Sequence, residues 1–270
     1  MARRGIQRYI RGIGLTEVLD DVAPEEPLEI QVDTRPIAVT MRTPGHDEDL
    51  ALGFLVSEGL LHSPAEVQAI KANPRNAAGN SLCIYLAAEV VVDYQKLTRH
   101  VFGSSSCGIC GTASIAAVQR EFPRIAGGDF SVNSDALLSF PQQMQAAQTE
   151  FARTGGLHAA ALFSAAGELL EVREDIGRHN AVDKIVGRAF RNHQLPLNQH
   201  ILLVSGRSSF EIQQKALSAG IAFVAAVGAP SSLAVDFAQK TGQTLVGFLR
   251  AGRYNVYGGG ERIEPRPTVA

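Results

Sequence analysis

The stretch "HILLVSGRSSFEIQQKALSAGIAFVAAVGAPSSLAVDFAQKTGQTLVGFLR", residues 200–250, decides the fold class of this chain. Three short apolar runs alternate in it with two segments whose apolar residues fall at helical spacing. Because a strand–helix–strand order is typical of parallel strands joined by helical crossovers, the stretch predicts an α/β fold. Just upstream, "HAAALFS" and "ELLEVRED" indicate a hairpin that turns at Ala166-Gly167, so we expect a mixed sheet.

Helical patterns flank this hairpin, and we expect helices on both faces of the sheet. Residues 140–154 form a polar helical segment that Gly155-Gly156 would end. Residues 177–190 have an amphipathic pattern. Nearer the N-terminus, residues 27–45 predict two strands that turn around Thr34-Arg35, and residues 46–61 predict a helix. We divide the chain into a smaller β-rich part, residues 1–130, and an α/β cofactor-binding part, residues 131–270, or else one continuous domain.

Composition excludes several classes of protein. The chain has 270 residues with 25 basic and 27 acidic side chains, and a net charge of -2 argues against a general nucleic-acid binder. Three cysteines are too few for a disulfide scaffold. The N-terminal residues lack the apolar run of a signal peptide, and no stretch approaches the length of a membrane span. We therefore expect a cytoplasmic protein with neither a nucleic acid nor a membrane as partner.

The predicted strand ends carry residues suited to an anion. In an open α/β sheet, ligands bind outside the carboxyl ends of the strands. The turns there supply backbone N–H groups or hydroxyls, and three of four supply an arginine, which suits a phosphate or pyrophosphate. The alternative is that these serines and glycines are helix caps and turn residues. Neither a G-x-G-x-x-G nor a Walker motif is present, so we expect an unusual phosphate-bearing ligand. The candidate binding residues are Ser205, Gly206, Arg207, Arg178 and His179.

A cysteine pair, Cys107 and Cys110, lies in the run "SSSCGICG", residues 104–111. Four interpretations compete: a disulfide, half of a zinc site, a redox pair, or a sulfur nucleophile. "HDE" at residues 46–48 together with "CGIC" is similar to the zinc-deaminase pattern, but Ser106 stands where that pattern has proline. The small flanking residues and the basic residues upstream favour an activated cysteine that carries a group between two partners. Cys83, in an apolar strand, is predicted to be a core residue.

Six motifs in order resemble the formate dehydrogenase accessory sulfurtransferase (FdhD) family. They are "TPGHDEDLALGFLVSEGL" (43–60), "SSSCGICG" (104–111), "GGLHAAALF" (155–163), "REDIGRHNAVDKIVG" (173–187), "SGRSSFEIQQKA" (205–216) and "GAPSSLAVDFAQKTGQTLVGFLR" (228–250). The resemblance extends over about residues 28–257. It implies a sulfurtransferase whose fold is similar to that of cytidine deaminases without their catalytic zinc, and thus no metal site.

The resemblance also implies a function. Members accept sulfur from a cysteine desulfurase as a persulfide and pass it to the molybdenum of bis-molybdopterin guanine dinucleotide, which then enters formate dehydrogenase. Cys107 would carry the persulfide, with Cys110 as its accessory partner. The cofactor-binding stretch would be Phe248, Leu249, Arg250, Ala251, Gly252 and Arg253. A homodimer is expected. Two alternatives stay open: a non-catalytic molybdenum cofactor chaperone and a zinc-dependent deaminase-like hydrolase.

Overall fold

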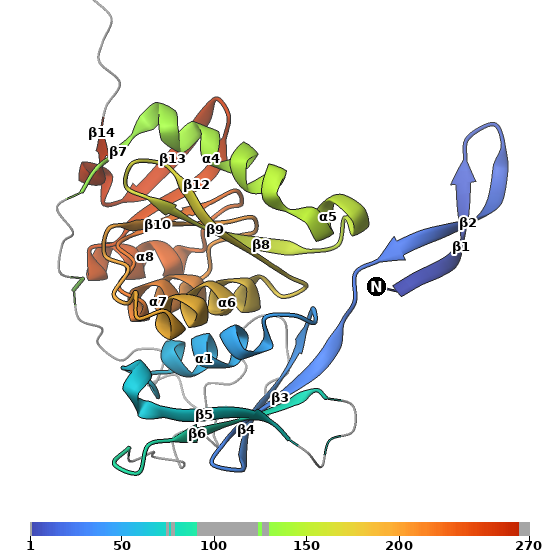
Figure 1. The fold of residues 1–270 in the computed structure, drawn as a ribbon. Coiled ribbons are helices and arrows are strands. Elements are labelled where there is room, and N and C mark those ends of the chain that lie inside the picture. The colour runs from blue at the N-terminus through green and yellow to red at the C-terminus, as the bar shows by residue number, and fades with distance from the viewer. Residues whose placement is uncertain (1, 74–75, 77–78, 91–123, 126–129, 265–270) are drawn as a thin grey trace, which may run out of the picture.

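A six-stranded mixed sheet forms the centre of the molecule. The computed structural model describes residues 2–73, 76, 79–90, 124–125 and 130–264 (Figure 1). The strand order is β13 (Arg253–Gly258), β12 (Thr244–Arg250), β11 (Phe223–Ala226), β10 (His200–Val204), β8 (His158–Ser164) and β9 (Leu169–Asp175). β10, β11 and β12 run parallel, whereas β8, β9 and β13 are antiparallel to their neighbours. The predicted mixed α/β sheet is confirmed, and the likeness to cytidine deaminases stays a prediction.

Helices cover both faces of this sheet, as predicted. One face packs against α4 (Ser134–Ala147), which α5 (Thr149–Thr154) follows in the chain. The other face packs against α6 (Arg178–Arg191), α7 (Phe210–Ser218) and α8 (Ser232–Thr241). Successive strand residues point to opposite faces. In β8, Phe163 therefore stacks on Phe140 of α4 with ring centroids 3.9 Å apart, while Leu162 belongs to the core on the α6 side.

A second, four-stranded sheet lies beyond these helices. Its order is β4 (Arg35–Arg42), β3 (Glu26–Val32), β6 (Ser81–Leu86) and β5 (Val67–Ala72), and β5 follows the short helix η1 (Pro64–Glu66). The turn between β3 and β4 has positive φ angles at Asp33 and Thr34, in agreement with the turn predicted there. Cys83 in β6 is buried, as predicted, and accepts a hydrogen bond from the Thr34 backbone N–H at 3.2 Å. Near the C-terminus, η2 (Gly260–Arg262) leads into β14 (Ile263–Glu264), which pairs with β7 (Val132–Asn133).

Helix α1 (Asp47–Ser57) joins the two sheets by crossing α6 at very short range (Figure 1). A Cβ atom on Gly53 of α1 would lie 1.8 Å from the backbone oxygen of Asp183 in α6. A Cβ atom on Gly187 of α6 would lie 1.8 Å from the backbone oxygen of Asp49 in α1. One buried cluster accordingly includes α1, α6 and strands of both sheets. The two predicted parts share this core, and their division at residue 130 stays a prediction because residues 126–129 lie outside the described ones.

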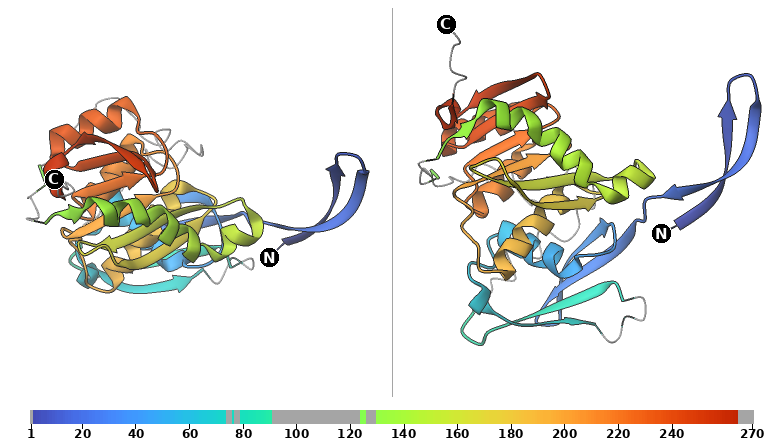
Figure 2. Two further views of the ribbon diagram at one scale, coloured as in Figure 1. Left: turned by 90° about the horizontal axis from the view of Figure 1, so that it is seen from above. Right: turned by 45° about the horizontal axis from the view of Figure 1, so that its top comes forward.

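The N-terminal residues form a projecting β-hairpin that the sequence pattern did not predict. β1 (Ala2–Ile10) pairs antiparallel with β2 (Gly14–Val22), and the views agree that this arm stands away from the rest of the chain (Figures 1 and 2). Its tip turns through Gly12 and Gly14, whose φ angles of 87° and 98° suit glycine. Apolar residues lie on both faces of the arm, so the sequence lacks the alternation that marks a half-buried strand.

The α1–α6 crossing predicts that Gly187→Ala destabilises the fold. The added methyl group would overlap the α1 backbone, and we expect a loss of about 1–3 kcal/mol or more in the free energy of unfolding. Urea denaturation measures it. Gly5→Ala is the matched control, because a Cβ atom there meets nothing within 4 Å. Equal stability of the two variants would contradict the close crossing.

Candidate functional site

The buried carboxylate of Asp175 fixes the start of α6. Its Oδ1 accepts the Gly177 backbone N–H at 2.8 Å, and its Oδ2 accepts the Thr43 backbone N–H at 3.1 Å. Lys184 Nζ lies 2.7 Å from Oδ2, and both side chains of this ion pair are almost fully buried. The contacts tie the end of β9, the first turn of α6 and the segment before α1 together. They therefore set the position of Arg178, the first residue of α6.

The predicted strand-end turns come together at one edge of the six-stranded sheet. β10, β11 and β12 end there, and β8 begins there. Backbone hydrogen bonds connect the turns: Ser205 N–H donates to the Ala159 oxygen at 2.9 Å, Gly228 N–H to the Gly206 oxygen at 2.9 Å, and Phe248 N–H to the Gly228 oxygen at 3.0 Å. These three amides are therefore engaged by the chain itself.

Four side chains and a glycine gather at this edge, and we name them the strand-edge cluster: His158, Arg178, Ser205, Gly206 and Arg207. A Cβ atom on Gly206 would lie 3.4 Å from both Arg178 Cδ and His158 Nδ1, so these two side chains flank the glycine. Ser205 Oγ lies 3.5 Å from His158 Nδ1. Arg178 Nε is buried and has no hydrogen-bond partner among the described residues, whereas Arg207 is exposed. The cluster can therefore offer positive charge and hydrogen-bond donors to an anion.

His179 lies deeper than Ser205, Gly206, Arg207 and Arg178. Its Nε2 is 3.2 Å from Ser209 Oγ and 3.3 Å from Glu211 Oε2, and the residue is 9% exposed. Burial, followed by the charge of Arg178, lowers the pKa of His179 from 6.5 to about 3. The imidazole is thus neutral at pH 7. Its contact with Ser209 stabilises the turn before α7, next to the strand-edge cluster.

The stretch from Phe248 to Arg253 crosses from β12 to β13 at the same edge. Phe248 has a φ angle of 53° and is 41% exposed. Leu249 is fully buried in the core on the α4 side, so its side chain supports the stretch from within. Arg250 donates from Nη1 to the backbone oxygens of Val227 and Leu249. Arg253, its partner in the β12–β13 register, is exposed. Ala251 and Gly252 form the exposed turn between the two arginines.

The two predicted sulfur-carrying residues, Cys107 and Cys110, lie outside the described residues. Their roles stay predictions. Within the described part of the chain, sequence reasoning missed His158 as a member of the strand-edge cluster. The available signal was its place at the start of the predicted strand "HAAALFS", which pairs antiparallel with the strand ending at Val204.

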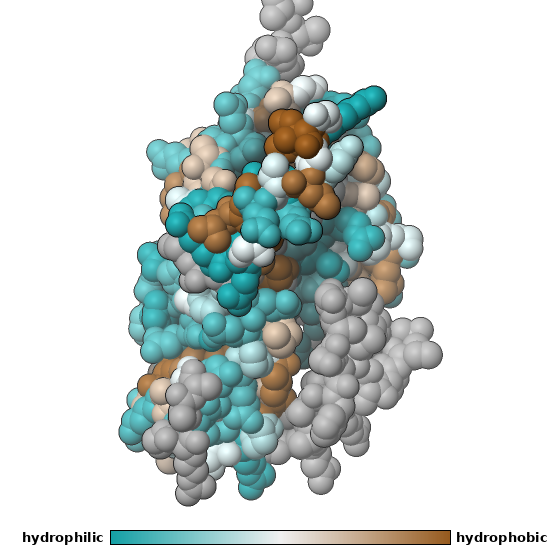
Figure 3. Space-filling view, turned by 90° about the vertical axis from the view of Figure 1, so that its right-hand side faces the viewer, coloured by the Kyte–Doolittle hydropathy of each residue, from teal (hydrophilic) through white to brown (hydrophobic). Residues whose placement is uncertain are grey.

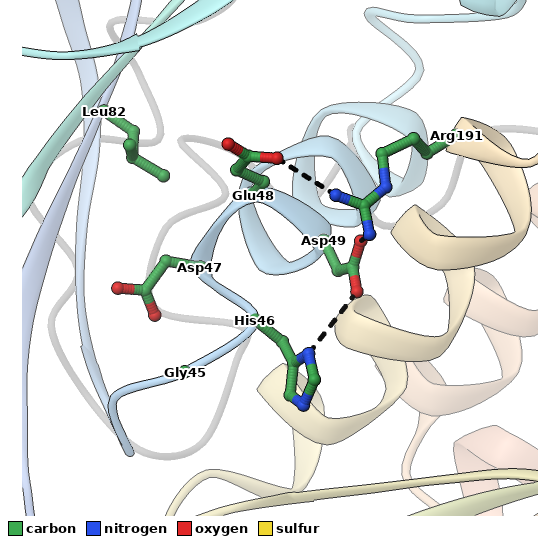
Figure 4. A pocket seen from close by; sticks show the side chains of 7 residues that line it. All are labelled: Gly45, His46, Asp47, Glu48, Asp49, Leu82 and Arg191. Atoms are coloured by element: carbon green, nitrogen blue, oxygen red, sulfur yellow. Dashed lines mark hydrogen bonds and ion pairs between the residues drawn. The ribbon is translucent and has the colours of Figure 1, made fainter.

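A hollow lies at the N-terminus of α1 (Figure 4). It has a volume of about 360 Å³, and Gly45, His46, Asp47, Glu48, Asp49, Leu82 and Arg191 line it. Asp49 is 1% exposed and lies 2.9 Å from Arg191 Nη2 and 3.8 Å from His46 Nδ1. Burial and then the charge of Arg173 lower the pKa of His46. The Asp49 charge is thus already paired, and the contacts between Asp49, Glu48 and Arg191 hold α1 to α6.

Comparison with known proteins defines the family. The FdhD/NarQ family model matches residues 23–264, and the chain belongs to this family. A sulfur carrier protein FdhD from Streptomyces coelicolor is 50% identical over 257 residues, with 93% of this chain and 91% of the relative covered. The sulfur carrier protein FdhD from Mycobacterium tuberculosis is 48% identical over 268 residues, with 95% and 97% covered.

A solved structure shows the same fold. The crystal structure of a protein from Desulfotalea psychrophila, described as a formate dehydrogenase accessory protein, matches with a TM-score of 0.76 and 25% identity. The match covers 97% of this chain and 99% of that one. Separately, no helix among the described residues has the length and apolar character needed to cross a membrane.

The lowered pKa of His179 predicts a loss of stability in acid. As pH falls below about 6.5, the unfolded chain protonates this imidazole while the folded chain does not. The unfolded state then binds more protons, so stability falls with pH by up to about 1.4 kcal/mol per pH unit until about pH 3. Urea denaturation between about pH 7 and 4 should show a shallower slope for His179→Gln than for wild type. The exposed His62 provides the control, His62→Gln; an unchanged slope in His179→Gln would contradict the assignment.

Proposed function

We propose that this chain is a cytoplasmic sulfurtransferase required for formate dehydrogenase activity. It accepts sulfur from a cysteine desulfurase as a persulfide on Cys107 and transfers it to the molybdenum of bis-molybdopterin guanine dinucleotide. Membership of the FdhD/NarQ family and 50% identity to a protein named as a sulfur carrier support the first half of this proposal. The relation to formate dehydrogenase is supported by the description of the Desulfotalea psychrophila protein.

The observation that carries the cofactor proposal is the convergence of arginines at one sheet edge. Arg178 belongs to the first turn of α6, Arg207 follows β10, and Arg250 and Arg253 flank the turn after β12. A bis-guanine dinucleotide contains two pyrophosphates, and guanidinium groups bind such oxygens through charge-assisted hydrogen bonds. The exposed ring of Phe248 offers a face on which a guanine base can stack. Gly206 lies beside Arg178, and Ser205 precedes it in the same turn.

The two cysteines provide a balanced route for sulfur. The Cys107 thiolate attacks the outer sulfur of the donor's persulfide, and the donor cysteine leaves as a thiolate. Transfer of that sulfur as sulfide requires two electrons. A Cys110 thiolate that attacks the inner sulfur supplies them, because a Cys107–Cys110 disulfide forms and hydrosulfide is released toward the metal. Reduction of the disulfide by a cellular dithiol would then restore the carrier.

The sulfur step predicts a mass change that depends on Cys107. Wild-type protein, Cys107→Ala and Cys110→Ala are incubated with a cysteine desulfurase and cysteine, and their intact masses are measured. We expect one added sulfur in wild type and Cys110→Ala, its loss on reduction, and no addition in Cys107→Ala. If no variant gains sulfur and the protein still binds nucleotide, the sulfurtransferase proposal is wrong. The non-catalytic chaperone would then be the better interpretation. Zinc at about one ion per chain would instead favour the deaminase-like hydrolase.

We also propose that the protein is a homodimer and that the β1–β2 arm contributes the contact. A two-stranded hairpin is marginal by itself, and this arm exposes large apolar side chains. Tyr9, Leu15 and Leu19 are 64–69% exposed and share one face of the hairpin by the strand register. Figure 3 views the side from which the arm projects and shows hydrophobic residues among hydrophilic ones. The arm spans residues 2–22. It therefore has about as many residues as each partner contributes to a standard interface, which is about 20–30.

The arm proposal predicts a change in solution mass. Tyr9→Asp with Leu19→Asp places charges on the shared face, and we expect sedimentation equilibrium to give a monomer where wild type gives a dimer. Leu170→Asp on β9 is the control, since Leu170 is 47% exposed and lies outside the arm. A dimer that persists in the arm variant would assign the contact to another surface, and a monomeric wild type would exclude the homodimer.

A further inference from the structure

The strand-edge cluster contains a histidine whose charge must depend on the ligand. His158 begins β8 and is half-buried at the edge where β10 ends. Its Nδ1 is 3.5 Å from Ser205 Oγ, and a Cβ atom on Gly206 would lie 3.4 Å from both this nitrogen and Arg178 Cδ. The imidazole and the Arg178 side chain therefore both lie next to Gly206, which has no side chain of its own. An anion bound over Gly206 would meet both groups.

The charged groups that shift the pKa of His158 come from two elements. Helix α6 contributes Arg178 and the neutral His179, and β9 contributes Asp175, while the neighbouring strand β10 contributes the uncharged Ser205. Burial and then the charge of Arg178 lower the pKa of His158 below 6.5, and the Asp175 carboxylate opposes this. That carboxylate is itself paired with Lys184. In the free protein the imidazole is therefore neutral at pH 7.

A bound phosphate reverses this balance. Its negative charge compensates the Arg178 guanidinium and attracts a proton to the imidazole, so the charged form of His158 becomes favourable. Arg178 has a donor ready for the same anion, because its buried Nε has no hydrogen-bond partner among the described residues. A group that is neutral without ligand and charged with it must take up a proton when the ligand binds.

We propose that His158 is a further ligand-binding residue and that it holds a phosphate of the nucleotide as an imidazolium beside Arg178, with uptake of one proton on binding. This inference rests on the proposed function, which places a guanine dinucleotide at the strand edge. It adds a residue outside the Phe248–Arg253 stretch and couples the affinity for the nucleotide to pH.

Calorimetry with diguanosine pyrophosphate tests the proposal. This probe has guanine bases and a pyrophosphate diester whose oxygens carry no proton near neutral pH, so any proton exchange belongs to the protein. Titrations in two buffers of different ionisation enthalpy give the number of protons taken up. For wild type we expect uptake that approaches one proton, and an affinity that rises by up to about tenfold per pH unit as pH falls from about 8 to 6.

His158→Gln should bind with no proton uptake and with an affinity that is independent of pH. His200→Gln is the matched control: burial also lowers the pKa of His200, but this residue lies at the opposite end of β10. It should retain the wild-type proton uptake.

The outcomes separate this inference from the proposed function. Binding by wild type without proton uptake, or unchanged uptake in His158→Gln, would overturn the role of His158 and leave the nucleotide site intact. No binding by wild type would overturn both. If His158→Gln does not fold, the His158 resonance of wild type can be titrated by NMR with and without the probe. Its pKa should rise on binding, and an unchanged pKa would contradict the proposal.

Discussion

The buried ion pair between Asp175 and Lys184 is the interaction on which the rest of the arrangement depends. Burying two charges is costly unless their remaining hydrogen bonds are satisfied, and here both are. Asp175 accepts from Thr43, Gly177 and Asn180, and Lys184 donates to the backbone oxygens of Thr43 and Glu174. One pair of side chains therefore joins the end of β9, the start of α6 and the segment before α1. The α1–α6 crossing at Gly53 and Gly187 then brings the two sheets onto a common core.

This constraint leads directly to the candidate site. Because Asp175 sets the start of α6, it places Arg178 beside Gly206. Backbone hydrogen bonds then connect Gly206 to Gly228 and Gly228 to Phe248. Rigid strands and a buried ion pair thus present the arginines without the need for a nucleotide-binding motif. Such a site is preorganised, so little ordering has to accompany ligand binding. The projecting arm exposes an apolar surface that suits a partner.

Much of this fold could be predicted from the sequence because its elements have strong periodic patterns. The strands ending at Val204 and Ala226, the helix from Arg178 and the turn at Thr34 all lie where local patterns place them. The arm could not be predicted, since neither of its faces packs against a core. At the site, the convergence of the turns followed from topology. The burial of Leu249 could not be predicted, because it depends on which side of β12 faces the core. The place of His158 in the strand-edge cluster could not be predicted either, because it depends on the pairing of β8 with β10.

We propose that a guanine nucleotide binds at the carboxyl edge of the six-stranded sheet. Hydrogen–deuterium exchange of the full chain, with and without diguanosine pyrophosphate, tests it most directly. Binding should suppress local opening, and we expect added protection in peptides that contain residues 204–209, 226–231 and 248–253. Peptides from the arm and from the hollow around residues 45–49 should not change. Protection confined to residues 45–49, or saturating binding with no protection at the strand edge, would contradict the account.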